Sequence, residues 1–167
     1  EHIYLGKPKT IADGAIYKAE FEAIKRENRI CKVPHDQNLP VYTSWDLGIL
    51  DATAIWFFQI YGKEIRVIDH YEANDEALSH YARILDEKTQ KYGYRYEKHF
   101  APHDIAARDL SSGVSREQTM ANLGHRMTKG PRLGVEERIE ATRQFLRNCW
   151  FDAEKCKHGI NALQNYR

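Results

Sequence analysis

The chain has 167 residues and a mass of 19.5 kDa, which suits a single domain. Hydrophobic residues make up 42% and charged residues 29%, so the composition excludes a disordered or fibrous protein. Lys and Arg number 25 against 24 Asp and Glu, which excludes a strongly basic nucleic-acid binder but not a local basic face. The longest apolar run, residues 52–60, is too short to span a membrane, so no membrane partner is expected.

The cysteines and the lack of phosphate-binding motifs further limit the class of protein. Cys31, Cys149 and Cys156 are an odd count without a close pair, which is typical of reduced cytoplasmic thiols rather than a disulfide frame or a zinc site. The sequence contains neither GxxxxGK[ST] nor GxGxxG, so any ATP-driven motor must lie elsewhere. The polar first residues carry no pattern of a secretory signal.

The first half of the chain predicts a lead-in, one helix and three strands. Polar residues 1–13 are expected to be extended, residues 15–28 carry the amphipathic pattern of a helix, and residues 31–40, with two prolines, form a connector. Three apolar or aromatic runs follow, separated by turn residues, and each is typical of a strand. These runs are residues 41–47, 52–60 and 64–71.

The second half alternates helices with strands. A helix over 75–92, capped by Asn74 or Asp75, ends at Gly93, and a strand follows over 95–101. Shorter elements come next: a short helix near His103, a helix over 115–123 capped by Ser115, a weak strand over 125–128, and helices over 135–148 and 154–166. This order predicts an α/β protein with a mixed five-stranded sheet flanked by helices, the element order of a ribonuclease H-like core.

Asp46 is the first candidate for chemistry. It ends an apolar run and precedes Leu47 and Gly48. A carboxylate at the end of a central strand, beside a glycine that permits close approach, is a common way to hold a divalent cation. The same string also occurs in ordinary turns, where the aspartate caps the chain reversal. Asp46 is therefore a candidate metal ligand, with a turn cap as the alternative.

Asp104 is the second candidate. It follows the predicted strand 95–101 directly after Pro102 and His103, and capping of a helix N-terminus is its alternative role. In a ribonuclease H-like sheet the first and fourth strands are neighbours, so Asp46 and Asp104 could bridge metal ions. Two Mg²⁺ or Mn²⁺ ions about 3.5–4 Å apart, bound by hard oxygen ligands, can hydrolyse a phosphodiester.

Two further residues could support this pair. His103 could orient water or contact a metal, although packing or hydrogen bonding at the strand end is the favoured role. Asp51 could make a second contact to Asp46, but a place in the turn before Thr53 is favoured. Asp69 is expected to face solvent or to close a sheet edge.

Four basic residues lie in loops after the predicted catalytic strands. Cleavage without sequence preference requires contacts to the phosphate backbone, and Lys and Arg supply them. A solvated surface is the alternative role for each. These residues are Arg108, Arg116, Lys129 and Arg132.

Four segments in this order resemble the nuclease domain of bacteriophage terminase large subunits. The first is Trp45-Asp46-Leu47-Gly48 with Asp51-Ala52-Thr53-Ala54-Ile55, and the second is Val67-Ile68-Asp69-His70-Tyr71-Glu72 with Leu78-xx-Tyr81-Ala82. The others are Pro102-His103-Asp104-xx-Ala107-Arg108, with Gly113 and Ser115-Arg116, and Gly159-Ile160-xx-Ala162-Leu163-xx-Tyr166-Arg167. The resemblance covers nearly the whole chain from Gly14 onward.

The resemblance implies an endonuclease domain that cuts concatemeric double-stranded DNA during viral packaging. Asp46 and Asp104 are then the first and second metal-binding acids, with two Mg²⁺ or Mn²⁺ ions as cofactors. Residues 1–40 are expected to join an upstream ATPase domain, and residues 41–167 to form the nuclease domain. The family's third acid is expected after Arg167, so the C-terminal end of the domain is predicted to be missing. Implied partners are the small terminase subunit and the portal, in the cytoplasm of a host bacterium.

Three alternatives remain. Another ribonuclease H-like nuclease, such as a junction resolvase or an integrase, would share the acids. The Asp-Leu-Gly turn also occurs in sugar kinases and actin-like ATPases, but those need a duplicated domain that 167 residues do not provide. Finally, without a third acid the chain could serve as a non-catalytic DNA-binding or motor-docking module.

Overall fold

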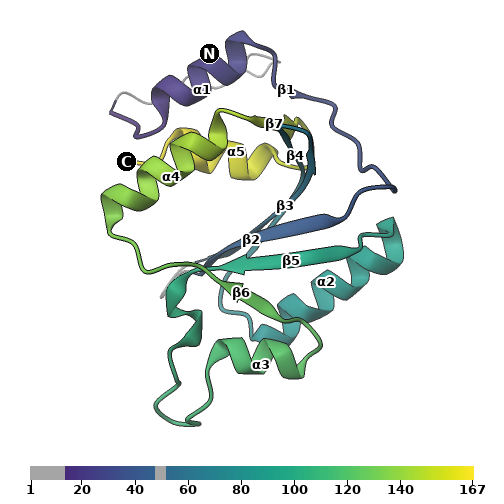
Figure 1. Cartoon of the computed structure of the whole chain (residues 1–167), viewed down its shortest axis with the longest axis vertical. Helices are drawn as coiled ribbons and strands as arrows, with labels where there is room; N and C mark the ends of the chain where they lie inside the picture. Colours follow the sequence, from purple (N-terminus) through teal and green to yellow (C-terminus); the bar gives the residue numbers. More distant parts are fainter. Residues whose placement is uncertain (1–13, 48–51) are drawn as a thin grey trace. The chain divides into compact units, whose positions relative to one another are not determined.

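A computed structural model describes residues 14–47 and 52–167 of the chain. Seven strands form one mixed sheet in the order β1-β7-β4-β3-β2-β5-β6, accompanied by five α-helices (Figure 1). The strands are β1 Ile30–Cys31, β2 Val41–Leu47, β3 Thr53–Tyr61, β4 Glu64–Ala73, β5 Tyr96–Ala101, β6 Met127–Lys129 and β7 Cys149–Asp152. The helices are α1 Lys18–Arg26, α2 Leu78–Tyr92, α3 Arg116–Asn122, α4 Val135–Leu146 and α5 Lys157–Gln164, with a 3₁₀ helix η1 at His103–Ala106.

The predicted mixed α/β sheet flanked by helices is confirmed, and it has seven strands rather than the expected five. The two strands that the sequence did not predict are β1 and β7, of two and four residues. Phe151 of β7 lies in parallel register with both Ile30 and Val67. Segments this short contain no measurable hydrophobic period, and such strands form because a partner is present.

The described residues divide into two compact units, and each is considered by itself. The first comprises residues 14–34, 60–69 and 133–167, with α1, α4 and α5. Its core includes the fully buried Phe21 and Ile24 of α1, and the ring of Phe21 lies 6.1 Å from that of Phe151. Apolar side chains from one face of α1 therefore hold that helix in this unit.

Arg29 is a buried cation in the first unit. Its guanidinium donates to the carbonyl oxygen of Leu146 at 3.0 Å and to that of Cys149 at 2.7 Å, and it pairs with Glu27 at 3.0 Å. The last carbonyls of a helix have no partner within the helix, so Arg29 satisfies one at the end of α4 and another at the start of β7. It thereby fixes the turn between these two elements.

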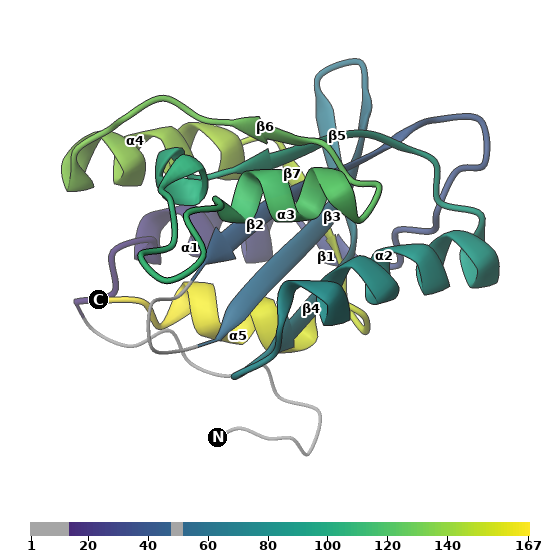
Figure 2. The same cartoon turned by 90° about the horizontal axis from the view of Figure 1, so that it is seen from below.

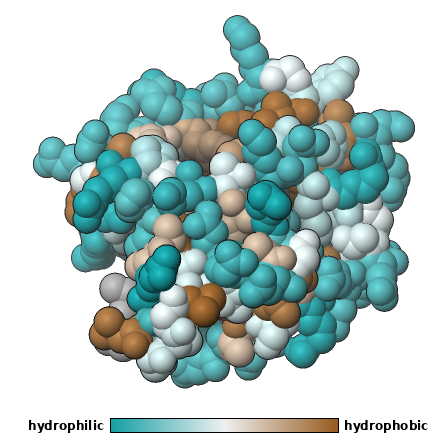
Figure 3. Space-filling model, turned by 60° about the horizontal axis from the view of Figure 1, so that its bottom comes forward, coloured by the Kyte–Doolittle hydropathy of each residue, from teal (hydrophilic) through white to brown (hydrophobic). Residues whose placement is uncertain are grey.

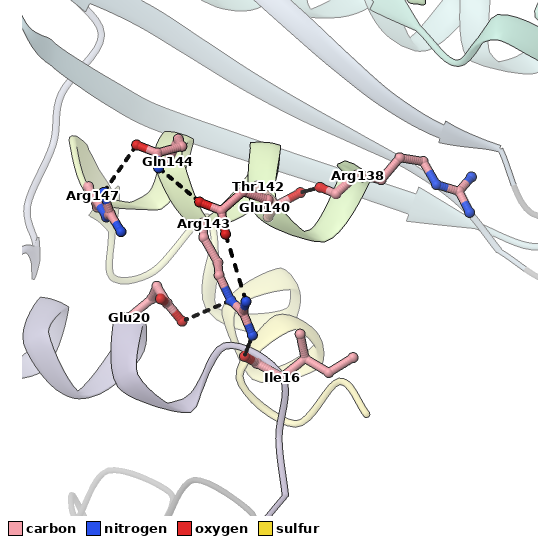
Figure 4. Close-up of polar contacts among 8 residues, drawn as sticks. All are labelled: Ile16, Glu20, Arg138, Glu140, Thr142, Arg143, Gln144 and Arg147. Atoms are coloured by element: carbon pink, nitrogen blue, oxygen red, sulfur yellow. Dashed lines mark hydrogen bonds and ion pairs between the residues drawn. The ribbon is translucent and has the colours of Figure 1, made fainter. Parts of the chain in front are cut away.

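Arg143 joins α4 to the start of α1 (Figure 4). It donates to the carbonyl oxygen of Ile16 at 3.2 Å and lies 3.9 Å from Glu20 and 3.8 Å from Glu140. Glu140 also accepts from Gln144 at 2.9 Å. Ion pairs of this partly exposed kind add little stability.

Buried polar groups in the first unit include thiols and a carboxylate. Cys31, Cys149 and Cys156 are free thiols, as predicted, and burial raises the pKa of Cys149 and Cys156. The expectation that Asp69 faces solvent or closes a sheet edge was wrong, because it is 4% exposed and β4 lies between β7 and β3 in the sheet. Its charge contributes to the raised pKa of Cys156. The middle of β4 is buried at three consecutive positions, so an alternating in-and-out pattern does not hold there.

The second unit comprises residues 35–47, 52–59 and 70–132. Here β2 pairs antiparallel with β3 and parallel with β5, and β5 pairs parallel with β6. Helices α2 and α3 pack on one face of these strands (Figure 2), where Trp45 contacts Tyr81 of α2 with ring centroids 6.0 Å apart. Because β2, β5 and β6 run in one direction, their carboxyl ends lie at the same edge.

The helix ends of the second unit test two predicted caps. Gly93 ends α2 with φ of 81°, a left-handed conformation that glycine adopts without strain, as predicted. The predicted capping of α2 by Asn74 or Asp75 was wrong, since the helix begins after Ala77 with no side-chain cap. Ser115 caps α3 as predicted, and its Oγ accepts from the backbone N–H of Gln118 at 3.1 Å.

The surface is mainly hydrophilic on the face shown in Figure 3, with hydrophobic side chains in separate patches. Leu110 is the most exposed of the large apolar residues that the structure describes, at 104%. Across residues 14–47 and 52–167, no helix combines the length and the apolar character needed to cross a bilayer.

Candidate active site

The position of Asp46 follows from the alternation of buried and more exposed side chains along β2. Val41, Thr43, Trp45 and Leu47 are buried, whereas Asp46 is exposed near the carboxyl end of the strand. It therefore lies on the opposite face of β2 from Trp45, level with Ala54 of β3.

Asp104 is presented by the 3₁₀ helix that follows β5. Pro102, which lacks an N–H, ends the strand and precedes η1, and the fully buried Ile105 anchors this helix. The carboxylate of Asp104 remains 56% exposed and lies 3.8 Å from the guanidinium of Arg116. Its alternative role as a helix cap was wrong, because the cap position is occupied by Pro102 and no side-chain cap bond is made.

The structure brings the two aspartates to one edge of the sheet. The last residue pair in the register of β2 and β5 is Ser44 with Phe100. Extending this register by two residues places Asp46 beside Pro102, which lies two residues before Asp104. Two carboxylates at the ends of neighbouring parallel strands supply the hard oxygen donors that Mg²⁺ and Mn²⁺ prefer. Within the two described stretches, no group of three or more His, Cys, Asp or Glu side chains is arranged to hold a metal.

The two supporting residues have different outcomes. Asp51 lies outside the described residues. His103 is exposed on η1, so it does not pack at the strand end, whereas hydrogen bonding there, the other part of the favoured role, stays a prediction. An exposed imidazole one residue before Asp104 stays available for contact with water, metal or phosphate.

The four predicted DNA-contacting cations all belong to the second unit. Arg116 is the first residue of α3 and forms an ion pair with Asp104. Arg108 forms an isolated antiparallel β-bridge with Ser115. Lys129 is exposed at the end of β6, in register with Ala101 of β5. Arg132 is also exposed, in the segment after β6. Arg116 and Lys129 therefore flank the strand end that delivers Asp104.

The segment between Asp104 and α3 is ordered by one carboxylate. Asp109 accepts from the backbone N–H of Ser111 at 2.7 Å and of Ser112 at 3.1 Å, and also from the hydroxyl of Ser111. The Ser111 hydroxyl and these N–H groups stabilise the charged form, so the pKa of Asp109 lies below its ordinary value. The exposed Leu110 is carried at the start of this turn.

Sequence reasoning missed a row of polar and ring contacts that begins on the buried face of β2 and β5. The indole N–H of Trp45 donates to Thr43 Oγ1 at 2.8 Å, and Thr43 Oγ1 lies 2.6 Å from His99 Nδ1. The rings of His99 and His125 are 5.3 Å apart, and His125 Nε2 lies 2.9 Å from Asp86 Oδ1. The sequence signal for these contacts was the presence of two polar residues, Thr43 and His99, at inward-facing positions of predicted strands.

His99 is kept neutral by this environment. It is 5% exposed, and burial, with a smaller effect from His125, lowers its pKa from 6.5 to about 4. A charged imidazole in such a place would lose its hydration without gaining a carboxylate partner. The side chain is therefore an uncharged hydrogen-bonding group at neutral pH.

The arrangement of strands and helices is that of the nuclease domains of large terminases, so the predicted resemblance is confirmed at the level of the fold. The nuclease domain of the P22 large terminase aligns over 95% of this chain and 81% of its own, with a TM-score of 0.64 and 12% identity. The large terminase nuclease of the thermophilic phage G20c with bound magnesium aligns over 93% of this chain and 82% of its own, with a TM-score of 0.60 and 11% identity.

The large terminase of another thermophilic bacteriophage gives a TM-score of 0.67 at 11% identity. The alignment covers 93% of this chain but only 38% of that protein, so this chain corresponds to a little over a third of its length. No family model matches the sequence, and no curated protein matches it either.

Proposed function

We propose that this chain is the nuclease domain of a viral DNA-packaging terminase, a metal-dependent endonuclease that cuts concatemeric double-stranded DNA. The observation that carries the proposal is the delivery of Asp46 and Asp104 to one edge by the neighbouring parallel strands β2 and β5. The same fold in phage G20c has been solved with bound cobalt and with bound magnesium, which supports a divalent cation as the cofactor.

Asp46 and Asp104 would hold two Mg²⁺ or Mn²⁺ ions. When bound, such ions activate water and stabilise the leaving oxygen of a phosphodiester. The chain's own residues hold the substrate in place. Arg116 and Lys129 flank the end of β5, and contacts from these cations to phosphates fix the position of the duplex. Contacts to phosphate carry no base information, so cleavage is expected to have low sequence specificity.

The test is nicking of supercoiled plasmid in Mn²⁺, with and without EDTA. Asp46→Asn and Asp104→Asn should each lower the rate by about a thousandfold or more, because each removes a ligand charge. Glu97→Gln is the matched control, since Glu97 is an exposed acid near the other end of β5. Cleavage only by a chain extended past Arg167 would indicate that a further acid is needed. If neither chain cleaves in Mn²⁺, the nuclease proposal fails.

The wider context follows from the same proposal. Residues 1–40 would lead from an ATPase motor domain into the nuclease domain at 41–167, and the small terminase subunit and portal would be further partners in the host cytoplasm. The longer thermophilic-phage terminase, solved with ATP-gamma-S and with ADP, supports the nucleotide-driven part of this context. Copurification of the motor-linked chain with small subunit and portal would test it, and failure to associate would contradict it.

A further inference from the structure

Trp45, Thr43 and His99 are linked by hydrogen bonds on the buried face of β2 and β5, and the ring of His125, which pairs with the exposed Asp86, lies beside His99. Thr43 and His99 are direct partners in the parallel register of β2 and β5. Thr43 lies three residues before Asp46, and His99 lies five residues before Asp104. The bond between their side chains therefore joins the two strands that carry the candidate acids, in addition to the backbone ladder.

The positions of the hydrogens in these side-chain contacts follow from which groups can donate and which can only accept. An indole N–H only donates, so Thr43 Oγ1 must accept from Trp45. Thr43 keeps its own hydroxyl hydrogen, and donating it to His99 Nδ1 at 2.6 Å satisfies both groups, with that nitrogen as the acceptor. In this assignment the hydrogen of the neutral imidazole sits on Nε2 of His99. At the other end a carboxylate only accepts, so His125 Nε2 donates to Asp86.

This assignment makes the bond between β2 and β5 depend on a neutral His99. A proton on Nδ1 would leave the buried Thr43 hydroxyl without its acceptor, and a buried donor without a partner costs free energy. The titratable groups that face His99 are Tyr96 on its own strand and His125 after α3, with rings 4.9 Å and 5.3 Å away. Asp86 of α2 pairs with His125.

We infer that Thr43, Trp45 and neutral His99 are positioning residues that hold the carboxyl ends of β2 and β5 in register and thereby set the separation of Asp46 and Asp104. The consequence for cleavage rests on the proposed nuclease function, whereas the consequence for the strand ends does not. None of the three side chains reaches the face of β2 that carries Asp46, so they act through the backbone.

The test compares Thr43→Val with Thr43→Ser. Valine keeps the shape but removes the hydroxyl, while serine keeps the hydroxyl and serves as the conservative control. In Thr43→Val the amide and carboxyl NMR signals of Asp46 and Asp104 should move, and kcat for plasmid nicking should fall by about 10- to 100-fold with KM unchanged, since small misplacements cost this much. Thr43→Ser should restore both. If Thr43→Val does not fold, Trp45→Phe, which removes the indole donor together with part of the buried ring, should shift the Asp104 signals by less.

The outcomes separate this inference from the proposed function. Unmoved Asp46 and Asp104 signals in the variants would overturn it, as would a loss of thermal stability with kcat unchanged in a cleaving protein. A His99 Nδ1 that carries the hydrogen at neutral pH, detected by ¹⁵N NMR, would also overturn it. If neither the wild-type chain nor the extended chain cleaves, the nuclease proposal fails, while the NMR comparison still decides the positioning role.

Discussion

The two units use buried polar groups for different purposes. In the first, Arg29 turns inward to satisfy backbone carbonyls at the end of α4 and the start of β7, so a charge holds secondary structure together. In the second, Thr43 and His99 form an uncharged link between two strands that carry exposed acids. The second unit therefore combines a neutral buried layer with a charged exposed edge, an arrangement suited to a metal site.

The largest expected effect on stability lies in the first unit. Phe21→Ala should lower the free energy of unfolding by about 4 kcal/mol, because it removes a fully buried aromatic ring that packs on Phe151. Urea denaturation would measure the loss, with Phe21→Leu as a milder control. The rate of plasmid nicking by the folded protein should stay within about twofold of wild type. A large fall in that rate would show that the two units do not have separate roles.

The next effect is a pH dependence that belongs to the second unit. The folded pKa of His99 is about 4 against 6.5 ordinarily, so the unfolded chain takes up the proton first as pH falls. The contribution of His99 is fully present above pH 6.5 and is lost progressively as pH falls toward 4, up to about 3 kcal/mol. Denaturation at a series of pH values should show this slope in wild type and a weaker slope in His99→Gln. An equal slope in His99→Gln would contradict the burial argument.

A smaller effect is expected where α3 begins. Ser115→Ala removes the acceptor for the N–H of Gln118 and should cost about 1 kcal/mol. Since α3 starts with Arg116, which pairs with Asp104, the same change should also weaken duplex binding in Ca²⁺, measured by fluorescence anisotropy. Ser112→Ala, in the preceding loop, is the control. Unchanged stability in Ser115→Ala would mean that the cap does not hold the helix.

The smallest effect concerns the link between α1 and α4. Arg143→Gln removes two ion pairs of 3.8 and 3.9 Å whose partners are partly exposed, so the loss should be about 0.5 kcal/mol. Added salt should reduce the difference between variant and wild type, since it screens the pairs. Thermal unfolding at two ionic strengths would measure it. A loss above about 2 kcal/mol would place Arg143 with Arg29 among the residues that hold the first unit.

Much of the fold could be predicted because its longer elements carry a clear pattern. The strand 41–47 coincides with β2, since buried and exposed side chains alternate along it. The helix that ends at Gly93 was also found, because glycine marks the reversal. The short strand β7 could not be predicted, since its four residues become a strand only beside β1 and β4. The cap of α2 failed because Asp75 instead takes a left-handed conformation with φ of 54°.

The candidate site was predictable as a pair of residues but not as an environment. Asp46 and Asp104 were marked by position at strand ends, which a linear pattern can indicate. The Thr43–His99 contact joins residues 56 positions apart, and only the register of β2 and β5 brings them together. The exposure of His103 likewise depends on η1, whose apolar anchor Ile105 lies two residues later. Contacts made by register and by local turns are therefore the part that the pattern leaves open.

The discontinuity of the first unit has a consequence for the order of folding. Its α1 is made early, but β1 pairs with β7, which lies about 120 residues later in the chain. Closing so long a loop costs conformational entropy, and proteins dominated by such long-range pairings fold slowly. The second unit ends at residue 132, so all of its strands are synthesised before β7 exists. During synthesis the acid-bearing strands β2 and β5 can thus pair before β7, on which α1 packs, has been made.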